Sequence, residues 1–230
     1  MQTQSALSAD DQRRLVAAGV LLALLAVTVQ TALYMADIYA FDRRVRTLDL
    51  DGEGGFAAWT GSVATFSTGF VALLLSFVES SRRLCLLALA GAVTFLSIDE
   101  SLIIHERLGL AITEALDLSD KYVRVAWPAV YLPLLVAVAA LVFQLARTST
   151  DPARRLLVGG LVVLAGAVGL EIAKLALDLI PSLPIRGWLY TAQIALEEGA
   201  ELAGWILLTT GLAVRLLNQS ATQVTAIPRP

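Results

Sequence analysis

Charged residues are scarce in this sequence. Asp, Glu, Lys and Arg make up 16% of its 230 residues, whereas a soluble globular protein carries about 25%. The net charge of −3 is too small to indicate a nucleic-acid partner or a strongly charged one. Hydrophobic residues reach 57%, and the mean hydropathy is +0.72. This composition predicts an integral membrane protein.

Cysteine and histidine are almost absent, which removes several classes of protein. Cys85 is the only cysteine, so the chain cannot form an internal disulfide. His105 is the only histidine, so a haem site with two histidine ligands is excluded. The sequence also has no glycine-rich nucleotide-binding loop and no Ser-His-Asp pattern.

Six apolar runs of about 20 residues each predict six transmembrane helices, because that length crosses the hydrocarbon core of a bilayer. We place them at 15–36, 56–78, 84–106, 127–145, 156–180 and 188–214. The first run is longer than the apolar part of a signal peptide, and we interpret it as a retained span. The prediction is therefore an all-α, polytopic bundle over 15–217, with a cytoplasmic tail at 1–14 and a flexible one at 218–230.

The basic residues predict the orientation, because Lys and Arg are enriched in cytoplasmic loops. With both termini inside, eight arginines lie next to cytoplasmic helix ends: Arg13, Arg14, Arg82, Arg83, Arg147, Arg154, Arg155 and Arg215. The basic residues of the opposite loops are interleaved with acidic ones. We therefore expect an N-in/C-in protein, in a bacterial-type inner (plasma) membrane.

Acidic residues gather in the outer parts of three predicted spans. The stretch SIDESLIIHERLG (97–109) closes the third span, and the stretch ALEEGAELAG (195–204) lies in the sixth. The fifth span carries acidic residues as well. The polar residues of the three spans are Asp99, Glu100, His105, Glu106, Glu171, Lys174, Asp178, Glu197, Glu198 and Glu201. An ionised carboxylate at membrane depth is costly and usually marks a functional site. One lysine and one histidine cannot neutralise so many carboxylates.

This excess of negative charge predicts a site for a divalent metal ion. Oxygen ligands suit Mg²⁺, Mn²⁺ or Ca²⁺, and an imidazole extends the choice to Zn²⁺ or Fe. The expected ligands are Asp99, Glu100, His105, Glu106, Glu171, Glu197, Glu198 and Glu201, with Glu100 and Glu198 also acting in catalysis. Around them we expect Asp37, Glu53, Lys174, Asp178 and Tyr190. Lys174 should pair with Glu171 or Asp178.

Two shorter patterns leave alternatives open. DLDGEG (49–54) begins like a calcium-binding loop, but position twelve of that register is Thr60 rather than Glu. The alternative is an acidic, glycine-rich turn. SIDES (97–101) also resembles ALEEG (195–199), which is the similarity expected between the two halves of an inverted repeat. The alternative is a chance similarity, because the match is only five residues long.

Three functions follow from these patterns. The first is a metal-dependent membrane enzyme, a hydrolase or an oxidoreductase, whose site faces the extracytoplasmic side and acts on a lipid or another membrane-soluble substrate. The second is a divalent cation or cation/proton transporter, which needs access from both faces. The third is a binding or structural subunit, with the segment 109–124 lying on the membrane surface above an acidic pocket. The sparsely polar inner halves of the spans favour the enzyme.

Overall fold

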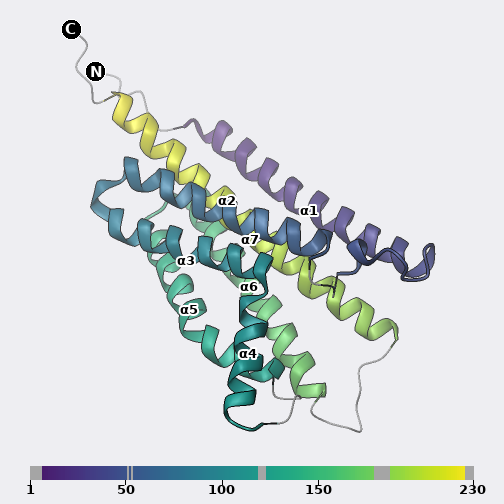
Figure 1. Ribbon diagram of the computed structural model, residues 1–230. Coiled ribbons are helices and arrows are strands. Elements are labelled where there is room, and N and C mark those ends of the chain that lie inside the picture. Colours follow the sequence, from purple (N-terminus) through teal and green to yellow (C-terminus); the bar gives the residue numbers. More distant parts are fainter. Residues whose placement is uncertain (1–6, 51, 53, 119–122, 179–186, 226–230) are drawn as a thin grey trace.

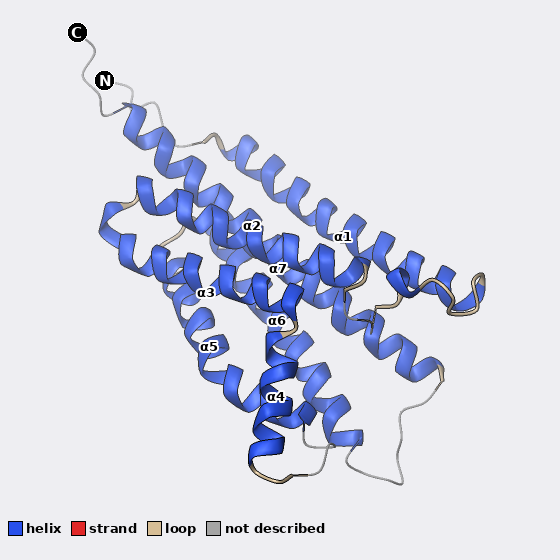
Figure 2. Cartoon of the chain, viewed as in Figure 1, coloured by secondary structure: helices blue, strands red, loops and turns tan. Residues whose placement is uncertain are grey.

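The computed structural model describes residues 7–50, 52, 54–118, 123–178 and 187–225. These residues form seven α-helices and two short 3-10 helices, and no strand occurs among them. The elements are α1 (Ala9–Tyr39), η1 (Arg46–Leu48), α2 (Phe56–Val78), η2 (Ser80–Arg82), α3 (Arg83–Leu102), α4 (Ile104–Ala115), α5 (Val123–Ala146), α6 (Asp151–Asp178) and α7 (Trp188–Thr225). Figure 2 shows that helix dominates the chain.

Six of the described helices are long and apolar enough to cross a membrane, namely α1, α2, α3, α5, α6 and α7. Each corresponds to one of the six predicted runs, so the prediction of an all-α bundle of six transmembrane helices is confirmed. The third run differs in a way that matters for the site, because it was expected to continue to residue 106. The helix ends at Leu102, and α4 follows as a separate, shorter helix.

The long helix α7 is the centre of the bundle. It packs against α1, α2 and α6, while α3 packs on α2, and α5 packs on α6 and α3. The start of α1 and the end of α7 lie at the same end of the bundle (Figure 1), where the Gln12 amide donates a hydrogen bond to Asn218. We call this the terminal end, and the opposite one, where α1 ends and α7 begins, the distal end.

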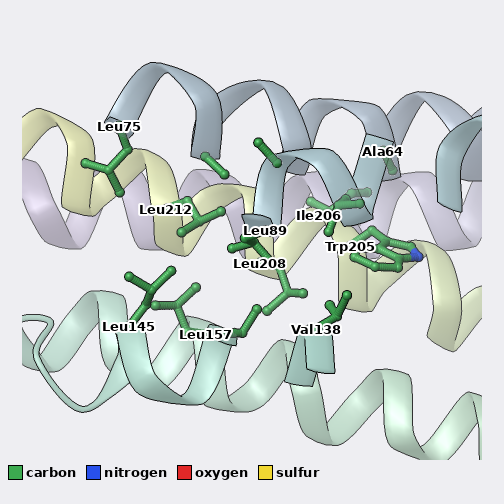
Figure 3. Packing of buried hydrophobic residues seen from close by; sticks show 14 of the residues in the cluster. Ala64, Leu75, Leu89, Val138, Leu145, Leu157, Trp205, Ile206, Leu208 and Leu212 are labelled. Carbon is green, nitrogen blue, oxygen red and sulfur yellow. The ribbon is translucent and has the colours of Figure 1, made fainter. Parts of the chain in front are cut away.

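The hydrophobic core fills the middle of the bundle between these two ends (Figure 3). Leu75, Leu89, Leu157, Leu208 and Leu212 are completely buried. Since lipid tails are as apolar as these side chains, close packing rather than hydrophobicity holds such helices together.

A close contact between α6 and α7 depends on glycine. A Cβ atom on Gly160 would lie 2.8 Å from Leu208 and 2.9 Å from the carbonyl oxygen of Gly204. No side chain fits in that space, so the backbones of α6 and α7 approach each other directly.

Candidate functional site

The site begins with a break in the chain at Ile103. This residue lies between α3 and α4 with φ 56° and ψ 42°, the left-handed region that β-branched side chains strongly disfavour. As a result α4 leaves the end of α3 at a sharp angle (Figure 1). The predicted continuous helix through residue 106 is therefore wrong.

Asp99 stabilises the break. Its Oδ1 accepts a hydrogen bond from the backbone N–H of His105 at 2.8 Å, in the first turn of α4. Aspartate side chains compete in this way with helical hydrogen bonding, and they satisfy N–H groups at the start of a helix. The Asp99 carboxylate thus caps α4 from the last turn of α3.

The same carboxylate holds the imidazole of His105 and the phenol of Tyr131. Nδ1 of His105 lies 2.9 Å from Oδ2 of Asp99, and the hydroxyl of Tyr131 on α5 donates to Oδ1 at 2.8 Å. Because an ionised carboxylate only accepts hydrogen bonds, the ring proton of His105 resides on Nδ1. In an unbroken helix, residues 99 and 105 would lie about 120° apart around the axis and could not meet.

Aromatic rings enclose this triad of Asp99, His105 and Tyr131. The ring of Trp127 lies 4.7 Å from that of His105, and Phe95 stacks on Tyr131 with centroids 6.2 Å apart. The side chains of Asp99 and His105 are only 7% and 14% exposed. Sequence reasoning missed Trp127 and Tyr131, although their i, i+4 spacing in WPAVY places both on one face of a helix.

Acidic groups on α6 and α7 act on His105. Glu171 on α6 and Glu201 on α7 both interact electrostatically with the histidine and with each other. Glu106 on α4 and Lys174 on α6 also act on Glu171. Glu201 in addition accepts a hydrogen bond from the indole N–H of Trp205 at 3.4 Å.

The other predicted ligands lie apart from the triad. The Glu100 side chain is near α2, since a Cβ atom on Gly61 would lie 3.9 Å from its Oε1. Glu197 accepts a hydrogen bond from Gln193 one turn earlier on α7. Glu198 is half-buried on the same helix.

Within the part of the chain that the structure describes, no three His, Cys, Asp or Glu side chains are arranged to hold a metal ion. The prediction of a single metal-binding carboxylate cluster is therefore not supported by the geometry.

The residues expected around the metal have separate positions. The carboxylate of Asp37 is buried and accepts a hydrogen bond from the backbone N–H of Val45, so it organises the chain after α1. Lys174 lies 5.5 Å above the ring of Tyr190, a cation–π contact between α6 and α7. Glu53 and the side chain of Asp178 lie outside the described residues.

An apolar groove between α2 and α3 leads toward the triad. It has a volume of about 520 Å³ and is lined by Phe66, Gly69, Phe70, Leu73, Leu87, Ala90, Gly91, Thr94, Phe95 and Ile98. Its residues on α3 span about 16 Å along the helix, and the last of them, Ile98, precedes Asp99. Phe95 belongs both to the groove and to the aromatic wall of the triad.

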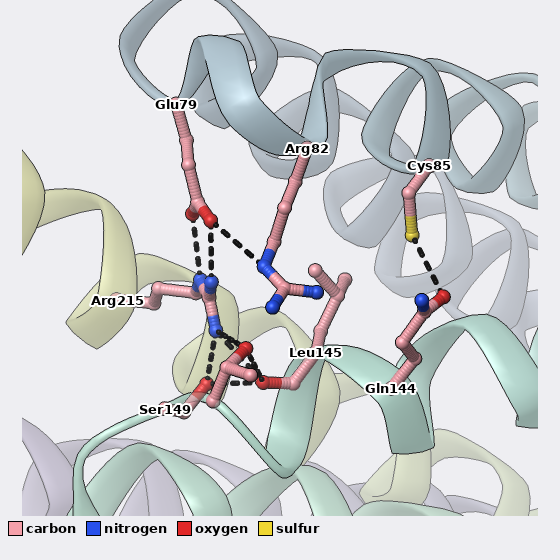
Figure 4. A network of polar contacts seen from close by, with 8 residues as sticks. Glu79, Arg82, Cys85, Gln144, Leu145, Ser149 and Arg215 are labelled. Atoms are coloured by element: carbon pink, nitrogen blue, oxygen red, sulfur yellow. Dashed lines mark hydrogen bonds and ion pairs between the residues drawn. The ribbon is translucent and has the colours of Figure 1, made fainter.

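A second buried polar network lies at the terminal end (Figure 4). Arg215 on α7 binds Glu79 through two hydrogen bonds, of 2.6 and 2.9 Å, and both side chains are almost completely buried. Its remaining nitrogen donates to the carbonyl of Leu145 and to the hydroxyls of Thr148 and Ser149. Sequence reasoning placed Arg215 next to a cytoplasmic helix end and missed this pair, which ties the α2–α3 and α5–α6 connections to α7.

Fold and site together define a polytopic α-helical membrane protein with a buried carboxylate–imidazole pair near one end of its bundle. The chain belongs to the family described as a domain of unknown function (DUF8692), whose match covers residues 9–216. No curated protein and no solved structure matches it.

Proposed function

We propose that this protein is a membrane-embedded enzyme that acts on a lipid or another membrane-soluble substrate by general acid–base catalysis at His105. The observation that carries the proposal is the hydrogen bond from Nδ1 of His105 to Asp99 in a nearly dry, aromatic-walled position. A carboxylate that fixes one ring nitrogen orients the imidazole and stabilises its protonated form, as in other acid–base sites.

The chemistry follows from that hydrogen bond. Since Asp99 binds Nδ1, proton exchange with a substrate falls to Nε2. In a hydrolysis, Nε2 would accept a proton from water while the water oxygen attacks, and would return that proton to the leaving group. Glu171 and Glu201, whose charges act on His105, would stabilise the imidazolium formed between these steps.

The groove between α2 and α3 supports a membrane-soluble substrate. Its rims are apolar side chains of membrane-spanning helices, so a hydrocarbon chain can enter it sideways from the bilayer. The groove shares Phe95 with the aromatic wall of the triad, which would place the reacting group of a bound molecule near the triad.

The experiment reconstitutes the purified protein in liposomes of a total membrane lipid extract and follows all lipid-soluble species by mass spectrometry. The main variant is His105→Asn, whose amide nitrogen can still donate to Asp99 while Nε2 is lost. We expect the wild type to convert at least one species and the variant to be at least 100-fold slower, which is the usual contribution of general acid–base catalysis.

A second pair of variants tests the groove. A Cβ atom on Gly91 would meet no atom within 4 Å, and Gly91 lines the groove, so Gly91→Leu should fill part of the groove. Gly166 on α6 also faces open space, and Gly166→Leu is the matched control. Gly91→Leu should raise KM and Gly166→Leu should not. The proposal fails if the wild type converts nothing in the extract, or if His105→Asn retains full activity.

A divalent metal ion at this site is a second candidate, favoured by one observation. Histidines that bind a metal usually donate their other ring N–H to a carboxylate, as His105 does to Asp99. Glu171 and Glu201 would supply the other ligands, but they would have to move closer than they are in the described structure. Elemental analysis of gently purified wild type and of His105→Asn decides, because only a metal bound at this site is lost in the variant. The prediction of a bacterial-type inner membrane stays a prediction.

A further inference from the structure

A polar pocket at the terminal end lies next to the buried Glu79–Arg215 pair. It has a volume of about 400 Å³ and is lined by Ser80, Ser81, Arg82, Arg83, Leu84, Cys85 and Gln144. The first six residues form η2 and the start of α3, and Gln144 comes from the last turns of α5. Figure 4 shows Arg82, Cys85 and Gln144 next to the buried pair.

The charge of this region is unbalanced. Glu79 is the acidic partner of two arginines, since it binds Arg215 through both oxygens and lies 3.3 Å from Nε of Arg82. One carboxylate cannot neutralise two guanidinium groups, so this trio keeps one positive charge in excess. Arg83, which is exposed, adds another at the pocket.

The pocket also offers neutral hydrogen-bond donors. Ser80 and Ser81 contribute hydroxyl groups. The carbonyl oxygen of the Gln144 side chain accepts from the Cys85 thiol at 3.7 Å, so its NH₂ group is the part that can donate to a ligand. Two guanidinium groups, hydroxyls and an amide together match a phosphate group, which accepts several hydrogen bonds at once.

The position of the pocket identifies the source of that phosphate. It lies where two membrane-spanning helices begin and end, and Leu84 next to the arginines is 83% exposed. A phospholipid whose phosphate bound there would have its hydrocarbon chains beside Leu84 in the bilayer. Basic pockets at this depth between transmembrane helices commonly bind anionic lipid headgroups.

We propose that the pocket formed by Ser80–Cys85 and Gln144 binds the phosphodiester headgroup of an anionic phospholipid. The bound lipid neutralises the excess positive charge of Arg82 and Arg83. It thereby strengthens the junction at which Glu79 and Arg215 join the α2–α3 and α5–α6 connections to α7.

The test measures lipid retention and thermal stability of the purified full-length chain in neutral detergent. Phosphatidylglycerol, phosphatidylcholine and inorganic phosphate are added separately, bound lipid is counted by native mass spectrometry, and the Tm is recorded. We expect the wild type to retain one phosphatidylglycerol and to gain Tm with it, and to respond to neither phosphatidylcholine nor phosphate.

The variants assign the effect to the pocket. Arg82→Gln with Arg83→Gln should weaken phosphatidylglycerol binding about tenfold or more. Arg83→Gln alone leaves the Glu79 contacts intact and should weaken it by a smaller factor, which guards against a general loss of folding. Arg154→Gln with Arg155→Gln removes two exposed arginines from α6 at the same end and should change nothing.

Three results would overturn the proposal. They are equal retention of phosphatidylcholine and phosphatidylglycerol, a gain in Tm from inorganic phosphate equal to that from the lipid, and unchanged lipid binding in both pocket variants.

Discussion

At the scale of single residues, Asp99 determines the site. It ends one helix, caps the next, fixes the tautomer of His105 and accepts a hydrogen bond from Tyr131. A buried carboxylate is stable only when its oxygens are satisfied in this way. The hydrogen bonds of Asp99 that the proposed chemistry requires also hold α3, α4 and α5 together, so variants of His105 separate the two roles better than variants of Asp99.

The backbone of Ile103 stores strain that a substitution should release. Replacing Ile103 by Gly removes the penalty of a left-handed β-branched residue, which is about 1–2 kcal/mol. We expect Ile103→Gly to leave the stability unchanged or to raise it by about 1 kcal/mol, measured by denaturant titration in detergent.

The control for Ile103 is the same substitution in a regular helix. Ile172 is 51% exposed in α6, and Ile172→Gly should cost about 1 kcal/mol through the loss of helix propensity alone. If both variants lost the same stability, the left-handed conformation of Ile103 would be wrong.

At the scale of the helices, the contact between α6 and α7 offers a sharp test, because two adjacent glycines differ completely. Gly160 faces Leu208 and the backbone of α7, whereas a Cβ atom on Gly159 would meet nothing within 4 Å. Gly160→Leu should destabilise the bundle by about 1–3 kcal/mol or more, as overpacking does. Gly159→Leu should leave the stability unchanged. Thermal unfolding of the two variants measures the difference. Equal effects of the two substitutions would contradict the packing of α7 on α6.

The sequence predicted the helices well and the site poorly, for physical reasons. A span is recognised from the sum of some twenty apolar residues, and that sum survives errors at single positions. The site depends on one dihedral angle at Ile103, where neither glycine nor proline signals a break. A continuous helix to residue 106 would place Asp99 and His105 on different faces, and Asp99 and Glu106 on the same face. The long-range pairs Asp99–Tyr131 and Glu79–Arg215 have no local signal at all.

At the scale of the whole molecule, polar groups are concentrated at the two ends, and the middle is packed. The triad lies toward the distal end, the Glu79–Arg215 pair lies at the terminal end, and the leucine core separates them. The hydroxyls of Thr68 and Thr209 within that region bind each other at 2.7 Å, so they serve helix packing. This arrangement suits an enzyme with one entrance better than a transporter, which has to open its site to both sides.

Cysteine labelling measures that difference. In a protein whose own Cys85 has been replaced by Ala, Leu89→Cys and Leu208→Cys should resist a water-soluble thiol reagent, because both positions are completely buried. Ser81→Cys, exposed at the terminal end, should react and serves as the positive control. Reaction at Leu89→Cys or Leu208→Cys that changed with divalent cations or with pH would reveal an opening through the core and would favour a transporter.

The most direct test of the site uses the fact that the chain has only one histidine. Protein labelled with ¹⁵N-histidine in detergent or liposomes gives ring-nitrogen signals that come from His105 alone. We predict a proton on Nδ1 in a strong hydrogen bond, with a signal that shifts in Asp99→Asn, shifts less in Tyr131→Phe, and is unchanged in Glu197→Gln. A spectrum of a freely hydrated imidazole that is unaffected by Asp99→Asn would show that the Asp99–His105 pair does not exist, and the proposed catalytic site would fall with it.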